Sequence, residues 1–296
     1  MSRHIRIDHL VIVHRLLVCC LAGIGLVTPP LFATNHYQLD TDLPYRPEAM
    51  TNPAMSRCKF DFYRPVKTNG FATVVWFHGG GMTAGEKFIP QQLQDQGIAV
   101  IAASYRYSSD SARCPAYIDD AAAATAWAFA NIENYGGSSN RIFVSGASAG
   151  AYLTLMVGLD KSYLARYGIE ANRIAGLIPI TPQVITHFAV RKERGLKDTQ
   201  PVVDVFAPLY HVRADAPPIM LSCGDREKEL LGRYEENAYF WRMMKIAGHK
   251  DISFVEIPGK DHAGVTEPAL AYTMPFIRRV VAQTGCGSSR GERPSE

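Results

Sequence analysis

The stretch "RIFVSGASAG" (residues 141–150) joins a short apolar run to a serine held between two glycines. "RIFV" has the apolar core of a strand, and "ASAGAYLTLMVGL" continues from it with the composition of a helix. Two interpretations of Ser148 are open: an ordinary Gly/Ser turn, or a sharp strand-to-helix turn that exposes a nucleophile. Gly146 and Gly150 permit the second, because small neighbours allow such a strained turn.

Apolar strands and helices alternate along the rest of the chain. Strands without polar alternation are expected in "FATVVWF", "IAVIAASYRY", "RIAGLIPI", "PPIMLSCG" and "ISFVEIPG". Helices are expected in "KFIPQQLQDQG", "CPAYIDDAAAATAWAFANIENYGG", "RYEENAYFWRMMKIAG" and "PALAYTMPFIRRVVAQ". Residues 34–58 should form an irregular lead-in, and residues 181–217 an insertion over the site. The pattern predicts one α/β domain, with a mostly parallel sheet covered by helices on both faces.

The composition is that of an ordinary globular protein, with 296 residues, 47% hydrophobic and 20% charged, and a net charge of +3. Because this charge is small and dispersed, no nucleic-acid partner is expected. Three arginines precede the uncharged run "LLVCCLAGIGLV", and small residues follow near Ala33, which predicts a signal peptide over residues 1–33. The run is short for a membrane span, and an uncleaved anchor is the alternative.

These boundaries predict a secreted or periplasmic protein without a stable membrane span after processing. The domain would occupy residues 34–283, and residues 284–296 would form a disordered tail. Of the six cysteines, two lie in the predicted signal peptide, which leaves four. An oxidising compartment permits disulfides, and Cys58 with Cys114 is the pair to test, whereas Cys223 ends an apolar strand as a buried thiol. No zinc-like spacing occurs, and no metal or organic cofactor is expected.

Reactive groups follow other strands of the predicted sheet, at the ends where ligands bind in an open α/β sheet. "HGGG" (residues 78–81) follows "TVVWF", and glycines there let backbone N–H groups face the oxyanion of a tetrahedral intermediate. The first N–H of the helix after Ser148, from Ala149, is expected to face the same oxyanion. His262, in "GKDHAG", follows "ISFVEIP" and is the expected general base.

Together these motifs resemble the α/β-hydrolase superfamily, and within it the hormone-sensitive-lipase-like and feruloyl-esterase-like carboxylesterases. The resemblance covers about residues 60–283 and rests on "WFHGGG", "SYRY", the alanine-rich helix, "SGASAG", "GDRE" and "IPGKDHAG" in this order. It implies the α/β-hydrolase fold, with Ser148 as nucleophile and His262 as general base. It also implies that Gly80 and Gly81 supply oxyanion-hole N–H groups beside that of the helix.

The triad acid is the point at which the sequence departs from the family pattern. "CGDREKE" follows "PPIML" and offers three acids, one of which could orient the imidazole. Many relatives have Gly-x-x-Asp here, and counting from Gly224 makes Glu227 the expected acid, since glutamate can serve in this fold. Asp225, one step from the strand, is the alternative. Glu229 is then expected to be a solvated charge.

The sequence therefore predicts a serine carboxylic ester hydrolase that forms an acyl-enzyme on a small-molecule ester. The signal peptide and the resemblance favour short-acyl or carbohydrate-linked esters. Met82, beside the glycine loop, and Tyr105, in "SYRY", are expected to contact the substrate. One alternative is an amide hydrolase with the same triad. Another is a non-catalytic binding protein, which usually loses the nucleophile, the base or the oxyanion loop.

Overall fold

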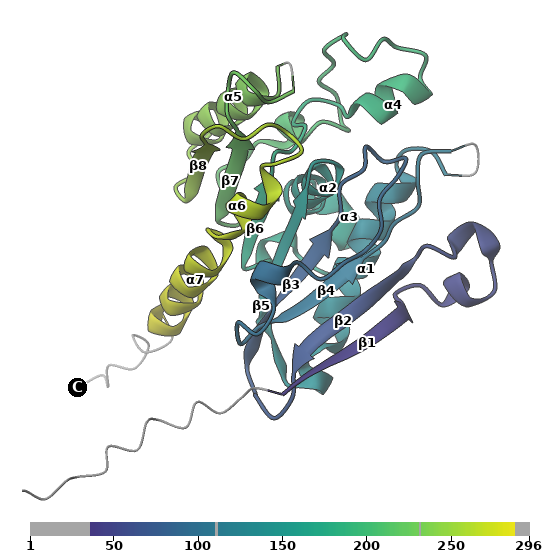
Figure 1. Cartoon of the computed structure of the whole chain (residues 1–296), viewed down its shortest axis with the longest axis vertical. Helices are drawn as coiled ribbons and strands as arrows, with labels where there is room; N and C mark the ends of the chain where they lie inside the picture. Colours follow the sequence, from purple (N-terminus) through teal and green to yellow (C-terminus); the bar gives the residue numbers. More distant parts are fainter. Residues whose placement is uncertain (1–35, 110–111, 231, 288–296) are drawn as a thin grey trace, which may run out of the picture. The chain divides into compact units, whose positions relative to one another are not determined.

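The computed structural model describes residues 36–109, 112–230 and 232–287 (Figure 1). Its strands form one eight-stranded sheet in the order β1-β2-β4-β3-β5-β6-β7-β8. Neighbouring strands run parallel from β4 to β8, whereas β1 and β2 form an antiparallel edge. The strands are β1 (Tyr37–Pro44), β2 (Lys59–Pro65), β3 (Phe71–Phe77), β4 (Ala99–Ala103), β5 (Gly137–Ala147), β6 (Gly176–Ile180), β7 (Ile219–Gly224) and β8 (Ile252–Ile257).

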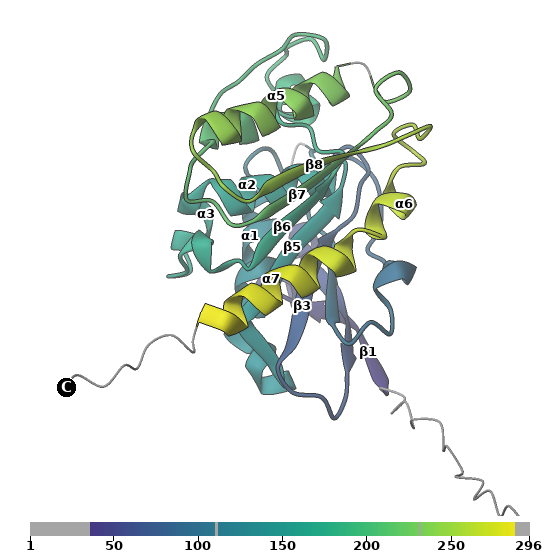
Figure 2. The same cartoon turned by 90° about the vertical axis from the view of Figure 1, so that its left-hand side faces the viewer.

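Helices cover both faces of this sheet (Figure 2). The α-helices are α1 (Ala116–Asn131), α2 (Ala149–Leu159), α3 (Lys161–Ala165), α4 (Phe188–Glu193), α5 (Arg233–Ile246), α6 (Thr266–Leu270) and α7 (Thr273–Gly287). One core, which includes Val75, lies under α1, α2 and α5, and a second core, which includes Val74, lies under α6 and α7. Because successive strand residues face opposite ways, strands buried on both sides must be apolar throughout. The predicted two-faced α/β architecture is confirmed.

Two segments differ from the sequence prediction. Residues 34–58 were expected to be irregular, yet they contain β1, which pairs with β2 as an edge strand and has no buried residue. An exposed edge strand carries no apolar run, so its sequence "YQLDTDLP" gave no signal. The segment "KFIPQQLQDQG" forms only a 3₁₀ turn at Gln91–Leu93. Pro90 disfavours helical backbone at the residue before it, and Leu93 alone in this turn is buried.

The expected C-terminal helix is two helices, α6 and α7. The second continues to Gly287, past the predicted boundary at residue 283. The predicted signal peptide lies outside the described residues. Within the described ranges, no helix has the length and apolar character needed to cross a membrane.

Three thiols of the described residues are unpaired. Cys58, Cys114 and Cys223 are free, so the suggested bond between Cys58 and Cys114 is not formed. Cys223 is buried at the end of β7, as expected. Burial raises the pKa of all three thiols to about 12, which keeps them protonated and unreactive at neutral pH.

Candidate active site

Ser148 occupies a sharp turn between β5 and α2. Its backbone has φ 52° and ψ −113°, a conformation that costs a serine about 1–3 kcal/mol and must be held by its surroundings. Its N–H donates to the carbonyl oxygen of Ile180 at 2.9 Å. A Cβ on Gly146 would lie 2.5 Å from the carbonyl carbon of Gly150, and one on Gly150 would lie 2.0 Å from the carbonyl oxygen of Phe77. Both glycines are therefore required for the close approach that presents the serine.

His262 lies in the loop after β8 and contacts Ser148. Its Nε2 is 2.8 Å from Ser148 Oγ, and its Nδ1 is 2.5 Å from Glu229 Oε1. With the proton on Nδ1, the ring donates to the carboxylate and accepts the serine hydroxyl proton at Nε2. The structure thus brings together the predicted nucleophile and the predicted base, in a line that continues to a carboxylate.

That carboxylate belongs to Glu229, and the prediction of Glu227 or Asp225 is corrected. Glu227 is exposed, while Asp225 accepts the N–H groups of Glu227 at 3.0 Å and Gly259 at 2.7 Å. The chain after β7 makes a helical turn, in which Glu229 N–H donates to the Asp225 carbonyl at 2.8 Å. Such a turn brings the fourth residue after Asp225 back beside the strand end, whereas counting along an extended chain stops at Glu227.

Glu229 is held by several donors in a buried position. Its side chain is 0% exposed. Oε1 also accepts the N–H of Leu230 at 2.9 Å, and Oε2 accepts the Thr181 hydroxyl at 2.7 Å and the N–H of Gly224 at 3.2 Å. Burial acts to raise the pKa of this carboxyl, but the hydrogen bonds from His262, Leu230 and Thr181 outweigh it and lower the pKa to about 2. Glu229 therefore stays ionised and can stabilise a protonated imidazole.

Thr181 is a site residue that the sequence analysis missed. It follows β6 with φ 47°, an uncommon conformation for a β-branched residue. Its hydroxyl bonds Glu229 and lies 3.4 Å from His262 Nδ1, while its carbonyl accepts from Arg233 Nη1 at 2.9 Å. The only available sequence signal was its position directly after a strand of the sheet.

The glycine loop after β3 supplies N–H groups beside the serine. Gly80 has φ 119° and Gly81 φ 63°, and a Cβ on Gly80 would lie 1.9 Å from the Ala84 carbonyl oxygen. Both line the same cavity as Ser148. Among the described residues, the N–H groups of Gly80, Gly81 and Ala149 donate to no protein acceptor. They are free to bind an oxyanion.

The prediction that Met82 and Tyr105 contact the substrate is wrong. Both side chains are fully buried. The Tyr105 ring stacks on His78 with 4.5 Å between centroids, and its hydroxyl donates to the His78 carbonyl at 2.9 Å. The Met82 carbonyl accepts the N–H of Ser108 at 2.7 Å. These residues pack against the glycine loop and do not line the cavity.

The cavity at Ser148 has a volume of about 470 Å³. Phe188 comes from α4 in the predicted insertion 181–217, so this segment does border the site. A Cβ on Gly81 would lie 2.9 Å from Phe188 Cζ, which shows that the ring packs directly on the glycine loop. Beyond the triad and the loop, the lining includes Phe88, Phe188, Leu230, Arg233 and Thr266. No group of three or more metal-binding side chains is assembled among the described residues.

Parts of the chain are similar in sequence to known proteins. The BD-FAE family model matches residues 60–174. Esterase LipC of Mycobacterium tuberculosis (strain ATCC 25618 / H37Rv) is 26% identical over 235 residues, which cover 70% of this chain and 57% of LipC. Esterase LipQ of the same organism is 27% identical over 183 residues, 55% of this chain and 42% of LipQ. The chain spans about half the length of the curated relatives it matches.

Two solved structures have a similar backbone. The truncated form of a carbohydrate esterase from gut microbiota superposes with a TM-score of 0.69 at 17% identity, covering 84% of this chain and 98% of that one. A bacterial heroin esterase superposes with a TM-score of 0.64 at 20% identity, covering 83% of this chain and 84% of that one. At these identities the likeness establishes the fold.

Proposed function

We propose that this chain, which has the α/β-hydrolase fold and is similar in sequence to esterases such as LipC, hydrolyses carboxylic esters through an acyl-enzyme. The observation that carries this proposal is the hydrogen-bonded line from Ser148 through His262 to Glu229, in which Ser148 and His262 line one cavity. A serine hydroxyl is a weak nucleophile at neutral pH, and this line supplies the base and the fixed geometry that it needs.

The proton follows the hydrogen bonds of the triad. Ser148 Oγ attacks the ester carbonyl while His262 Nε2 takes its proton, and Glu229 stabilises the imidazolium that forms. The imidazolium then gives this proton to the departing alcohol, which leaves an acyl-serine. Water, deprotonated by His262, attacks the acyl-serine; the acyl–Oγ bond then breaks, the acid leaves, and the imidazolium returns the proton to Ser148 Oγ.

Backbone N–H groups stabilise the negative charge of the tetrahedral intermediate. In both steps the carbonyl oxygen becomes an oxyanion beside the N–H groups of Gly80, Gly81 and Ala149, which are not engaged with other described residues. Donors fixed in advance need no reorganisation during the reaction, and each is worth about 10²–10³ in rate.

Acyl length tests the proposed activity. The walls of the cavity combine Phe88, Phe188 and Leu230 with the charged Arg233, so a continuous apolar trough is missing from its lining. Each methylene adds about 0.8 kcal/mol only where an apolar wall receives it. Across 4-nitrophenyl esters of increasing length, we expect the highest kcat/KM from acetyl to butyryl and little activity on emulsified long-chain triglyceride. A kcat/KM that keeps rising beyond about eight acyl carbons would contradict this expectation. Matched 4-nitroanilides measure amide cleavage in the same assay.

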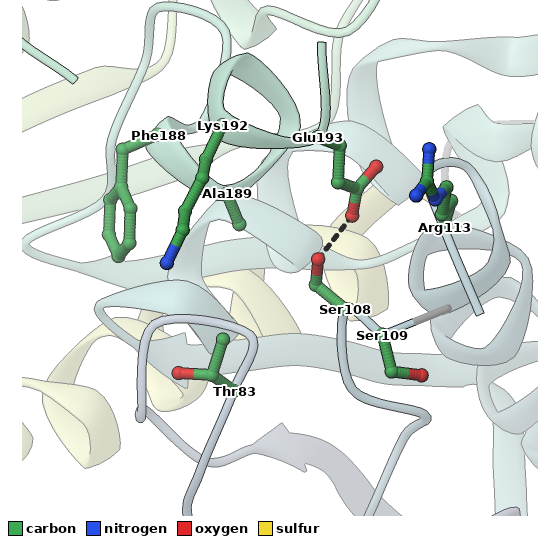
Figure 3. A pocket seen from close by; sticks show the side chains of 8 residues that line it. All are labelled: Thr83, Ser108, Ser109, Arg113, Phe188, Ala189, Lys192 and Glu193. Atoms are coloured by element: carbon green, nitrogen blue, oxygen red, sulfur yellow. Dashed lines mark hydrogen bonds between the residues drawn. The ribbon is translucent and has the colours of Figure 1, made fainter. Parts of the chain in front are cut away.

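A second cavity supports a carbohydrate-linked substrate as the finer proposal. It has a volume of about 320 Å³ and shares Phe188 with the cavity at Ser148. Figure 3 shows side chains of α4 facing the loops that carry Thr83 and Ser108, with Glu193 bonded to the Ser108 hydroxyl. Lys192 and Glu193 add charge to this lining. Hydroxyl and charged groups beside an aromatic ring suit a hydroxyl-rich alcohol portion.

Export is a further part of the proposal. The run "LLVCCLAGIGLV" behind a basic N-terminus has signal-peptide proportions. We expect the mature chain to begin near Thr34 and to be found outside the cytoplasm, which N-terminal sequencing of protein from its own host will test. Retention of Met1 in a membrane fraction would favour an uncleaved anchor.

A further inference from the structure

Two buried arginines line a third cavity that adjoins the catalytic one. This cavity has a volume of about 490 Å³ and shares Phe188, Leu230 and Arg233 with the cavity at Ser148. Arg191 of α4 and Arg233 of α5 are only 3% and 4% exposed. Arginines are almost never buried to this degree unless they are paired. Their partners therefore decide what the cavity can bind.

Neither guanidinium forms an ion pair with a carboxylate of the described residues. Arg233 Nη1 donates to the Thr181 carbonyl at 2.9 Å, and Arg191 Nη1 donates to the Gln200 carbonyl. The Nε of Arg191 has no partner in the structure. A backbone carbonyl satisfies one N–H but does not neutralise the charge, which is offset only by carboxylates beyond ion-pair distance.

The nearby acids offset this charge only in part. Glu236 is close to both arginines but is engaged with the N–H of Val184 at 3.1 Å, and burial raises its pKa. Asp198 is exposed at the rim of the cavity. Burial lowers the pKa of both Arg191 and Arg233, although Glu236 acts in the opposite direction on both and the ionised Glu229 does so on Arg233.

We propose that this cavity binds a carboxylate of the substrate, so that the preferred esters carry a carboxylate on their acyl or alcohol part. The proposal rests on the proposed ester hydrolysis at Ser148. A guanidinium matches the two oxygens of a carboxylate with parallel N–H donors. Because Arg233 borders both cavities, one ligand can reach the arginines while its ester carbonyl lies at the serine.

Paired esters test this proposal on both sides of the scissile bond. On the acyl side, mono-4-nitrophenyl glutarate is compared with 4-nitrophenyl pentanoate. On the alcohol side, 4-acetoxyphenylacetate is compared with 4-ethylphenyl acetate. In at least one pair we expect kcat/KM to be about 10- to 100-fold higher for the carboxylate, the usual gain from hydrogen bonds to a charged group. The favoured pair identifies which part of the ester enters the cavity.

Variants locate the effect. Arg191→Gln should bring the ratio of carboxylate to neutral ester close to one. Arg226→Gln removes the same charge from an exposed arginine that is paired with Glu256 at 2.6 Å, and it should leave the ratio unchanged. If both variants lower the ratio of carboxylate to neutral ester equally, the preference comes from the overall charge of the protein, and the proposal is overturned. If Arg191→Gln does not fold, the ratios measured for the wild-type protein still test whether esters that carry a carboxylate are preferred.

The outcomes separate this proposal from the proposed function. Neutral esters turned over without a carboxylate preference in either pair would overturn the carboxylate site and leave the esterase intact. If no ester is hydrolysed, the proposed function fails. Calorimetry with glutarate on the full chain then tests whether the third cavity binds a carboxylate. Glutarate binding that weakens in Arg191→Gln but not in Arg226→Gln supports the site, and no binding to the wild type overturns it.

Discussion

Replacing Ser148 by alanine is expected to lower kcat on 4-nitrophenyl acetate by about four to six orders of magnitude. The members of a triad act as a unit, so removal of the nucleophile forfeits nearly all of their joint contribution. The N–H groups at Gly80 and Gly81 remain in place, and the small residual rate comes from them and from binding. Steady-state kinetics and loss of labelling by a fluorophosphonate probe measure the effect.

Ser145, three residues earlier in the same motif, provides the matched control. Its hydroxyl donates to the Ile178 carbonyl at 2.8 Å inside the sheet, away from the cavity. Ser145→Ala should therefore lose about 1 kcal/mol of stability, seen as a lower Tm, and retain its turnover. If Ser148→Ala keeps more than about a tenth of the wild-type rate, an acyl-serine mechanism is untenable.

The sequence predicted those parts of the site that depend on backbone shape and strand order. Gly146 and Gly150 signal the turn at Ser148 because no larger residue fits beside Phe77. His262 was found because it follows the last strand of a parallel sheet, and parallel strands bring their carboxyl ends to one edge. Such features are local or topological, and both can be read from a chain before it is folded.

Features that depend on side-chain direction were not predicted. Glu229 was assigned to solvent because the spacing was counted along the chain, whereas a helical turn returns it to the strand end. Met82 was placed in the pocket from its position beside the glycine loop and Tyr105 from the motif "SYRY", although both side chains are fully buried. Arg191 and Arg233 lie 42 positions apart in sequences that resemble surface helices. Nothing in either segment indicates that they meet at one cavity.

The identity of the acid gives the second large effect: Glu229→Gln is expected to lower kcat by about three to four orders of magnitude. Glutamine keeps the shape of the side chain but brings an amide NH₂ group. If this group donates to Nδ1 of His262, the ring proton moves to Nε2, and the ring can no longer accept the hydroxyl proton of Ser148. The charge that stabilises the imidazolium is lost as well.

Neighbouring carboxylates show whether this loss is specific. Glu227→Gln and Asp225→Asn change the same charge in the same turn, and Glu227 is exposed, so its variant should retain nearly the full rate. Asp225 accepts two backbone N–H groups, so its variant should lose some stability and much less activity than Glu229→Gln. Near-UV circular dichroism and Tm verify that each variant is folded. A larger loss of kcat in Glu227→Gln or Asp225→Asn than in Glu229→Gln would move the acid away from Glu229, because only the residue that bonds Nδ1 can fix the tautomer on which proton transfer depends.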